Sequence, residues 1–296
     1  MSTIGWVIYN GNLPSSKFVD FARMLQEAAH RQNGKLHIYK NNDLLSFLVS
    51  NEFKILKNTP ESLPDYVIFI DKDIYLARQL ESLGIPVFNS SRAIEISDDK
   101  ILTYQELVKE EIPIPSTIIA PKIFSTGTIE KNMLTQVIER LGLPLVIKEA
   151  FGSFGEQVYL VHSEAELREK VEQLQGKPFL FQSFLKSSFG QDLRLQVVGN
   201  HVVAAMKRTS EQDFRANVTS GGKMENYSPT TEEKVLAIRA AKAIGADFAG
   251  VDILFGPDDS RYVCEVNSNA HIRNLFDCTG INAADYIVRH ILRQIN

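Results

Sequence analysis

The N-terminal part of the sequence alternates short apolar runs with amphipathic helical patterns, and this alternation constrains the fold more than any other feature. The apolar runs predict strands at residues 4–9, 35–39, 66–70 and 87–88. Apolar residues at helical spacing predict helices at 17–30 and 74–83, which end at Asn33-Gly34 and at Gly84. Because strands that alternate with helices favour a parallel sheet, we expect an α/β domain over about residues 1–97.

A mixed pattern of helices and strands follows. One helix is predicted to begin at 97–100, with Ser97 or Asp98 as its cap, and to end before Pro113 and Pro115. Further helices are predicted at 129–141, 163–174, 230–245 and 282–294. Strands are predicted at 145–148, 157–161, 178–182, 250–255 and 261–267. Residues 194–198 and 201–207 predict a hairpin that closes at Gly199-Asn200.

Three oxygen-bearing side chains converge in the last two predicted strands. Glu265 and Asn267 are two residues apart, so they point to the same face of their strand. If residues 257–260 form a four-residue hairpin loop, which is a common type, Asp252 lies opposite Glu265. Hard oxygen ligands without histidine or cysteine suit magnesium. The alternative is an ordinary hairpin face that is polar because it meets water.

The same register assigns the other face of this hairpin. Gly256 would pair with Arg261, and Ile253 would pair with Cys264. Cys264 would then lie on the apolar face that packs into the core.

Lysines and glycines mark a candidate phosphate site upstream. Lys148 ends an otherwise apolar strand, so its ammonium must reach solvent or an anion. The loop at 149–155 contains Gly152 and Gly155, and glycines let a backbone approach phosphates closely. It is not a Walker A loop, because GxxxxGK[ST] is absent. Lys100 lies in the first turn of its helix, where a cation opposes the helix dipole. A plain turn and solvated lysines are the alternatives.

Two arginines are candidates for holding anionic oxygens. Arg208 follows a hydrophobic strand, and Arg215 lies in the segment DFRAN. A guanidinium binds phosphate or carboxylate oxygens as a planar fork. Surface arginines are common, so the alternative is that neither has a function.

The composition and the N-terminal sequence indicate which partners the protein binds and in which cellular compartment it lies. A net charge of −4 gives no indication of a nucleic-acid surface or of a polybasic membrane patch. Two cysteines cannot form a disulfide framework, and the N-terminus lacks a signal-peptide pattern. No apolar run approaches the roughly 20 residues of a membrane span. We expect a cytoplasmic protein that binds neither nucleic acid nor membrane.

Six further segments form an ordered set of motifs. They are DDKILTYQELVKEEIPIP (98–115), PLVIKEAFGSFG (144–155), QSFLKSSFGQDLRLQVVG (182–199), AAMKRTSEQDFRANVTSGG (204–222), AGVDILF (249–255), and EVNSNA (265–270) with TGIN (279–282). In this order they resemble the RimK-like glutamate-ligase branch of the ATP-grasp superfamily. The resemblance implies an ATP-grasp fold within the α/β class. Its parts would be a pre-ATP-grasp domain at 1–97, a central lobe at 98–182 with a lid loop at 149–155, and a C-terminal lobe at 183–296 with the metal site.

The resemblance also implies roles for individual residues. ATP would be bound by Lys100, Lys148, Gly152, Ser153, Gly155, Gln182, Ser183, Phe184, Leu185, Asp192, Arg215, Ala216 and Asn217. Two magnesium ions, which manganese can replace, would be held by Asp252, Glu265 and Asn267. Lys148 and Arg208 would act in catalysis, with Arg208 on an acyl phosphate. The substrate would contact Arg194, His271, Arg273 and Asn274.

The implied reaction joins a carboxylate to an amine in two steps. The carboxylate attacks the γ-phosphate of ATP to give an acyl phosphate and ADP, and the amine then expels phosphate. The substrates would be an amino acid such as glutamate and a small-molecule or peptide amine, and the protein would be a homo-oligomer, either a dimer or a tetramer. A phosphotransferase without ligation and a non-catalytic nucleotide-binding regulator are the alternative functions.

Two positions depart from the pattern of the family. The hinge has Ser183 where an acid is common, which bears on nucleotide preference. Where RimK continues with a Ser-Pro-Gly-Leu-like turn, residues 268–274 read SNAHIRN. Our hypothesis is that His271, Arg273 and Asn274 recognise a carboxylate or polar group on an acceptor other than a ribosomal-protein tail. A plain loop is the alternative.

Overall fold

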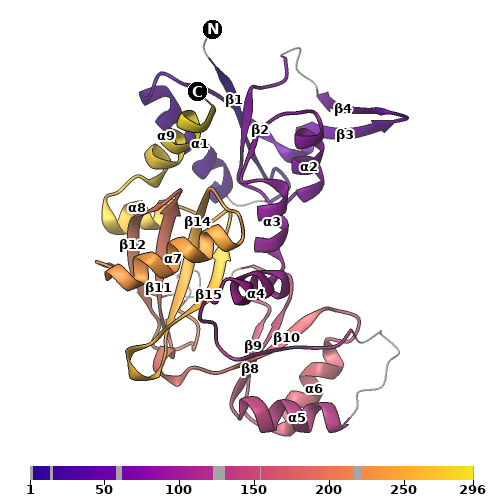
Figure 1. Ribbon diagram of the computed structural model, residues 1–296, viewed down its shortest axis with the longest axis vertical. Helices are drawn as coiled ribbons and strands as arrows, with labels where there is room; N and C mark the ends of the chain where they lie inside the picture. The colour runs from indigo at the N-terminus through magenta and orange to yellow at the C-terminus, as the bar shows by residue number, and fades with distance from the viewer. Residues whose placement is uncertain are drawn as a thin grey trace.

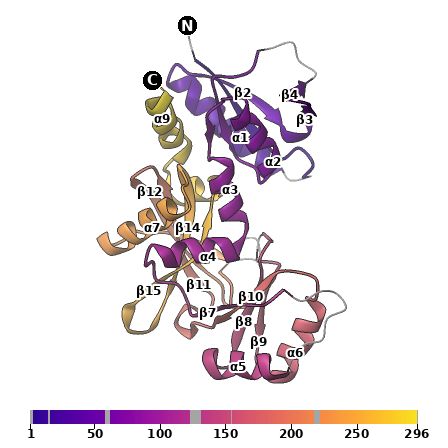
Figure 2. The same cartoon turned by 45° about the vertical axis from the view of Figure 1, so that its right-hand side comes forward.

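Three sheets and a separate hairpin organise the chain. The computed structural model describes residues 3–13, 16–57, 62–122, 131–153, 155–216 and 222–295. Figures 1 and 2 show the N-terminal sheet at one end of the long axis, the central sheet at the other, and the C-terminal sheet between them. Among the described helices, none has the length and apolar character needed to cross a bilayer.

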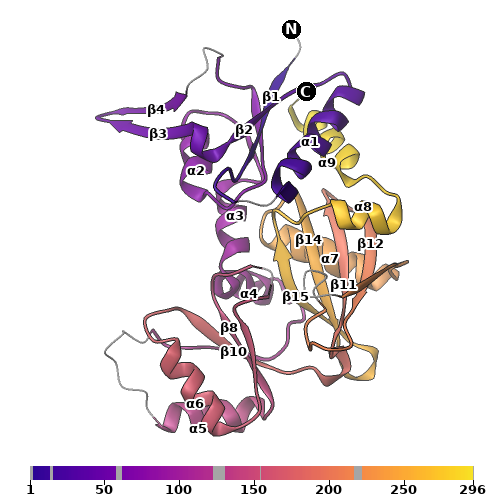
Figure 3. The same ribbon diagram turned by 180° about the vertical axis from the view of Figure 1, so that it is seen from behind.

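The N-terminal sheet is parallel, as the alternation of strands and helices predicts. Its strand order is β2 (Lys35–Lys40), β1 (Ile4–Tyr9), β5 (Tyr66–Phe69) and β6 (Val87–Phe88). Helix α1 (Ser16–Arg31) covers one face together with α9 (Ala283–Ile295), which returns from the far end of the chain (Figure 3). Helix α2 (Ile74–Ser82) covers the other face. The C-terminal helix therefore completes the N-terminal core.

A break divides the helix that is predicted from residue 97 onward. Helix α3 (Ser91–Asp98) ends at Asp99, and α4 (Lys100–Lys109) begins there. The extended backbone of Asp99 lets its carboxylate accept N–H groups of the first turn of α4. The predicted caps, Ser97 and Asp98, are therefore wrong. The Ser97 hydroxyl instead bonds the backbone of the C-terminal sheet at 2.8 and 2.9 Å.

The central sheet is antiparallel. Its strand order is β7 (Thr117–Ile119), β10 (Phe179–Ser183), β8 (Leu145–Glu149) and β9 (Val158–Val161). Helices α5 (Lys131–Leu141) and α6 (Glu164–Gln173) pack against it around a shared apolar core. These elements confirm the sequence prediction except for β7, which it missed. The first two residues of the predicted helix 129–141 lie outside the described part.

The C-terminal sheet carries the polar side chains of most interest. Its strand order is β13 (Lys223–Asn226), β12 (His201–Thr209), β11 (Gln191–Val198), β14 (Phe248–Phe255) and β15 (Arg261–Asn267). The predicted closure of β11 and β12 at Gly199-Asn200 is confirmed. Helices α4 and α7 (Thr231–Ala243) pack on one face of this sheet. Helix α8 (Arg273–Thr279), which the sequence did not predict, packs on the other face (Figure 3).

The hairpin of β3 (Leu44–Val49) and β4 (Glu52–Lys57) is a separate two-stranded sheet. The sequence analysis missed it. The run LLSFLV has no clean alternation of apolar and polar residues, and no Asn-Gly or Asp-Gly pair marks the turn.

One buried asparagine joins the N-terminal sheet to the C-terminal sheet. Asn89 follows β6 and is 0% exposed. Its Nδ2 donates to the carbonyls of Phe248 and Ser268 at 2.9 and 2.8 Å. Its Oδ1 accepts the N–H groups of Asp247 and Phe248 at 2.7 and 3.2 Å. All four hydrogen bonds connect the residue after β6 to the backbone of the C-terminal part, so Asn89 fixes the N-terminal sheet against the C-terminal sheet.

Replacing Asn89 with alanine should destabilise the protein by about 2–4 kcal/mol, because four buried backbone groups lose their partner together. Urea unfolding measures the loss. Asn42→Ala is the matched control, since Asn42 is exposed and its side chain donates to the exposed Asn12. The control should change stability by no more than about 0.5 kcal/mol. Equal losses in the two variants would show that the Asn89 bonds do not join the sheets.

Candidate active site

Strands β14 and β15 place two acids opposite each other. Asp252 pairs with Glu265, as the sequence predicts. The loop that joins the strands is one residue longer than predicted, since Phe255, rather than Gly256, pairs with Arg261. That difference alone would have moved Asp252 out of register with Glu265.

A β-bulge at Cys264 restores the register. Ile253 pairs with Val263 rather than with Cys264, and the ladder resumes one residue later at Glu265. Val263 is buried in the core, whereas the Cys264 Sγ lies 3.5 Å from the Nζ of Lys148. The prediction that Cys264 lies on the apolar face is therefore wrong, because the bulge interrupts the alternation of side chains.

Four charged side chains form a row on the site face of the sheet. Asp192 and Arg194 lie on β11, Arg208 on β12 and Asp252 on β14. Arg208 donates to both oxygens of Asp192 at 2.7 and 2.6 Å, and its Nη2 lies 3.1 Å from Asp252 Oδ1. Arg194 donates to both oxygens of Asp252, to Oδ2 at 2.7 Å. The row therefore alternates in sign, from Asp192 through Arg208 and Asp252 to Arg194.

Burial and pairing act in opposite directions on these carboxylates. Burial raises the pKa of Asp192 and outweighs its bonds to Arg208. Burial also opposes ionisation of Asp252, but Arg194 and Arg208 together outweigh it and lower the pKa of Asp252. The row therefore favours the ionised form of Asp252, whereas burial works against ionisation of Asp192.

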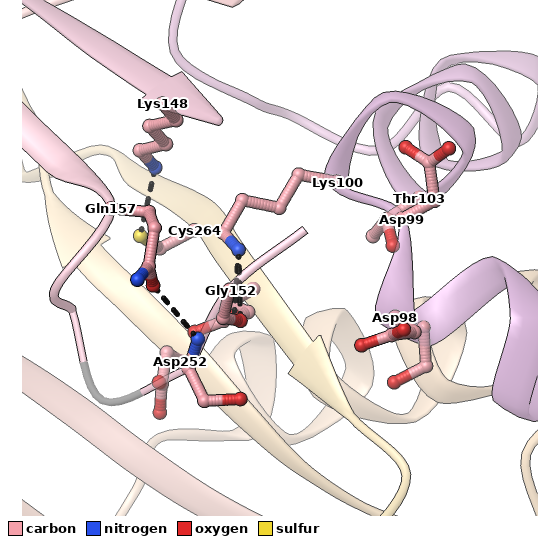
Figure 4. Close-up of polar contacts among 12 residues, drawn as sticks. Asp98, Asp99, Lys100, Thr103, Lys148, Gly152, Gln157, Asp252 and Cys264 are labelled. Carbon is pink, nitrogen blue, oxygen red and sulfur yellow. Dashed lines mark hydrogen bonds and ion pairs between the residues drawn. The ribbon is translucent and has the colours of Figure 1, made fainter. Parts of the chain in front are cut away.

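Two lysines approach this acidic edge from other elements (Figure 4). Lys100, the first residue of α4, places Nζ 3.9 Å from Glu265 Oε1 and 3.3 Å from the carbonyl of Gly152. Burial lowers the pKa of Lys100. Lys148 is buried at the end of β8, and its Nζ donates to the hydroxyl of Tyr104 at 3.0 Å. The two ammonium groups therefore lie beside Glu265 and Cys264 of β15.

The glycine-bearing loop is held from both sides. Lys72, at the end of β5, pairs with Asp98 at 2.6 Å and donates to the Ser153 hydroxyl at 3.2 Å. Arg215 donates to the carbonyl of Gly155 and pairs with Asp213. The sequence analysis missed Lys72, although polar residues at the carboxyl ends of parallel strands often contact ligands.

The predicted hinge lies between the central and C-terminal sheets. Gln182 is buried, and its Nε2 donates to the Thr117 hydroxyl at 2.8 Å. Ser183 donates its backbone N–H to Ser116 at 2.9 Å. The ring of Phe184 meets those of Phe189 and Phe214, and Leu185 leads into the next turn. Ala216 is buried, and Asn217 lies outside the described residues.

The predicted magnesium ligands do not by themselves complete a metal site. Within the described ranges, no three acidic, histidine or cysteine side chains are placed to hold a metal ion. Asp252 and Glu265 provide two carboxylates, and Asn267 pairs across from Gly250 with its Nδ2 buried and unbonded. Magnesium commonly takes one or two carboxylates and completes its shell with phosphate and water. The donor set fits a magnesium ion that arrives with a nucleotide.

The candidate substrate residues divide into two groups. Arg194 belongs to the charged row, whereas Arg273 donates two 2.8 Å bonds to Asp20 of α1. Asn274 follows Arg273 in α8 and is partly exposed. The guanidinium of Arg273 thus fixes α8 to α1.

His271 packs against α1. Its ring meets Phe18 edge-on with centroids 4.7 Å apart, and its buried Nε2 has no hydrogen-bond partner among the residues that the structure describes. Burial, reinforced by the positive charges of Lys17 and Arg194, lowers the pKa of His271 to about 4. The ring is therefore neutral at physiological pH.

The fold is that of the ATP-grasp class. A model of the RimK-like ATP-grasp domain matches residues 97–291, and the chain belongs to this family. The expectation of an ATP-grasp ligase that forms C–N bonds is thereby confirmed at the level of the family.

Curated relatives and solved structures agree with this assignment. The chain is 35% identical to a probable alpha-L-glutamate ligase of Trichodesmium erythraeum, over 74% of this chain and 72% of the relative. It is 35% identical to human N-acetylaspartylglutamate synthase A, over 67% of this chain and 50% of the relative. The ATP-grasp ligase PsnB, solved with a minimal precursor, Mg and ADP, has a TM-score of 0.71 at 16% identity, over 98% of each chain. This last similarity shows the shared fold.

Protonation of His271 should make the folded protein less stable in acid. The unfolded ring binds its proton near pH 6.5 and the folded ring near pH 4, so stability should fall as the pH drops from 6.5 to 4. His271→Asn should remove up to ~3 kcal/mol of that dependence. Urea unfolding at neutral pH and at about pH 5 measures it. His201→Asn, on the exposed β12 end, is the control and should keep the wild-type profile; identical profiles in all three proteins would refute the assignment.

Proposed function

We propose that this protein uses ATP to activate a carboxylate and joins it to an amine, with glutamate as the amino acid that it adds. The observation that carries the proposal is the buried row Asp192–Arg208–Asp252–Arg194, in which Asp252 lies opposite Glu265. Two lysines from other elements approach β15 beside it, with Lys100 3.9 Å from Glu265. Such a site can bind a triphosphate with its metal and still present a fixed cation to a second anion. The names of both curated relatives contain glutamate.

In this proposal the lysines bind the phosphates. Lys100 and Lys148 provide two ammonium groups, and Lys100 also donates to the carbonyl of Gly152 at 3.3 Å. Asp252, Glu265 and Asn267 would hold one or two magnesium ions, and manganese has the same preference for oxygen ligands. Bound magnesium would neutralise phosphate charge during transfer. Gln182–Leu185 would contact the base, and Asp192, Arg215, Ala216 and Asn217 would lie along the nucleotide.

Arg208 is suited to stabilise the reacting phosphate. Its guanidinium is buried and held by Asp192 and Asp252, so its position is set before substrate arrives. The carboxylate oxygen would attack the γ-phosphorus as ADP leaves, and the amine nitrogen would then attack the acyl carbon as phosphate leaves. Negative charge grows on phosphate oxygens in both steps, and a preorganised cation lowers the energy of that charge.

The glycine-bearing loop would close over the phosphates as a lid. Lys72 holds it from the N-terminal domain, and Arg215 holds it from the C-terminal lobe. Closure excludes water, which would otherwise hydrolyse an acyl phosphate. We place the domain limits at 1–97, 98–182 and 183–296, so that the lid is held by residues of all three parts.

We propose different roles for the four candidate substrate residues. Arg194 bonds Asp252 in the charged row, and we propose that Arg194 and His271 contact a substrate beside the phosphates. Arg273 would act indirectly, by fixing α8 against α1 through Asp20. Asn274 would line the substrate side of the site.

The test is ADP and phosphate release measured with ATP and magnesium, with glutamate alone, with an amine panel alone, and with both. Ligation requires release of both products only when both substrates are present, with a product mass equal to the sum of the substrates less one water. ADP release with a phosphorylated product that persists would indicate a phosphotransferase. Nucleotide binding without turnover in every mixture would indicate a regulator.

Glu265→Gln should reduce turnover by at least about a hundredfold, because the amide keeps the shape but loses the charge that binds the metal. The magnesium concentration for half-maximal rate should rise as well. Glu172→Gln, which changes an exposed acid on α6, should leave both values unchanged. An unchanged magnesium requirement in Glu265→Gln would remove Glu265 from the metal site.

Lys72→Met should raise the KM for ATP roughly tenfold, since it removes a charge-assisted hydrogen bond to the lid. ADP release without an acceptor should also rise, because a looser lid admits water. The control is Lys109→Met, which removes an exposed lysine that pairs with Glu106 on its own helix. Unaltered KM and unaltered uncoupled release would show that Lys72 does not hold the lid.

A further inference from the structure

Tyr104 of α4 is a buried polar residue to which the proposed function gives no role. It is 3% exposed, and it belongs to the apolar core between α4 and the C-terminal sheet. Its hydroxyl nevertheless lies within hydrogen-bond distance of three elements that surround the candidate nucleotide site. These contacts are with Lys148 of β8, Cys264 of β15 and Gln182 of β10.

The distances around the Tyr104 hydroxyl assign its proton. A phenol has one proton to donate. The carbonyl oxygen of Cys264 lies 2.7 Å from the hydroxyl, whereas Oε1 of Gln182 lies 3.4 Å away. The hydroxyl therefore donates to Cys264, and its lone pairs accept from the ammonium of Lys148 at 3.0 Å. Burial raises the pKa of Tyr104, so the phenol keeps its proton.

The β-bulge on β15 provides the carbonyl that fixes this phenol. Cys264 is the extra residue of β15 in its ladder with β14. The extra residue of a bulge is left out of the ladder, and bulges beside active sites commonly redirect a side chain. Here the carbonyl of Cys264 accepts from Tyr104, and its Sγ lies 3.5 Å from the Nζ of Lys148 (Figure 4). Both groups of the bulge thus lie against the same lysine and its phenol.

Lys148 has a donor left for an anion. An ammonium carries three N–H groups, and the contacts with Tyr104 and Cys264 use two of them. A phenol and a thiol are neutral at physiological pH. In the described part of the chain, no carboxylate bonds Lys148, although this residue is only 6% exposed. Because a buried cation without an anion is costly, the geometry favours a phosphate as the third partner.

We propose that Tyr104 is the positioning residue for Lys148. Its phenol, fixed by the carbonyl of Cys264, holds the ammonium in place before the nucleotide phosphates arrive. Since α4 begins with Lys100, one helix then places both phosphate-binding lysines, one directly and the other through Tyr104. This role rests on the part of the proposed function in which Lys148 binds phosphate, and it requires no particular carboxylate or amine substrate.

Calorimetric titration of the full chain with magnesium and AMPPNP, a non-hydrolysable ATP analogue, tests the proposal. Tyr104→Phe keeps the ring in the core and removes the acceptor, so it should weaken binding on the order of tenfold. Lys148→Met should weaken binding at least as much. Adding Tyr104→Phe to Lys148→Met should cause less than about a twofold further loss, because the phenol then has no ammonium to hold.

Two further variants separate positioning from general effects. Tyr227→Phe is the matched control, since it removes a phenol that bonds Glu233 and packs against the same apolar core. It should bind AMPPNP as the wild type does. Cys264→Ala removes the sulfur but keeps the carbonyl, so it should weaken binding less than Tyr104→Phe does.

Wild-type affinity in Tyr104→Phe would overturn the proposal, as would a wild type that does not bind AMPPNP. An equal loss from Tyr104→Phe with and without Lys148 would show a structural role only. An equal loss in Tyr227→Phe or in Cys264→Ala would show that the phenol of Tyr104 does not position the lysine. A chain that gives the expected binding pattern but ligates no substrate would refute the proposed function and leave the role of Tyr104 standing.

Discussion

The site depends on one interaction, the buried row of alternating charges Asp192–Arg208–Asp252–Arg194. Four charges taken from water each cost several kcal/mol, and only mutual pairing with good geometry offsets that cost. Cross-strand registry on β11, β12 and β14 provides the geometry. Because Asp252 meets two arginines, it remains ionised despite burial. In the proposed function, this one row would provide both a fixed carboxylate for a metal ion and a fixed guanidinium for phosphate.

The other parts of the molecule are arranged around this row. Asn89 binds the start of β14, and Lys72 reaches the glycine-bearing loop from the end of β5. Arg273 ties α8 to α1, and α9 completes the core under the N-terminal sheet. Hydrogen bonds and ion pairs around a polar site thus add to the apolar core that the N-terminal and C-terminal sheets share. Polar contacts of this kind can rearrange when a lid closes, whereas an apolar core resists such change.

Much of the fold could be predicted from periodicity, since the parallel N-terminal sheet and most helices carry clear patterns. The opposition of Asp252 and Glu265 was also predicted, but through two errors that offset each other. The loop has one extra residue, and the bulge at Cys264 has another. Neither is visible in hydrophobic alternation. The helix cap at Asp99 was missed because Ser97, Asp98 and Asp99 are all good capping residues, and only the backbone decides among them.

The sequence by itself determined which residue types can meet phosphate and metal, and on which strand faces they lie, because side-chain direction follows local periodicity. Tertiary structure decided which of them meet. Lys72 lies far from Ser153 along the chain, and Arg273 lies far from Asp20, so no local pattern links either pair. Tertiary structure also decided that Cys264 lies beside Lys148 and that most of the apolar strand β3 stays exposed. Long-range packing selects such contacts, and the energy of each depends on neighbours that are distant in sequence.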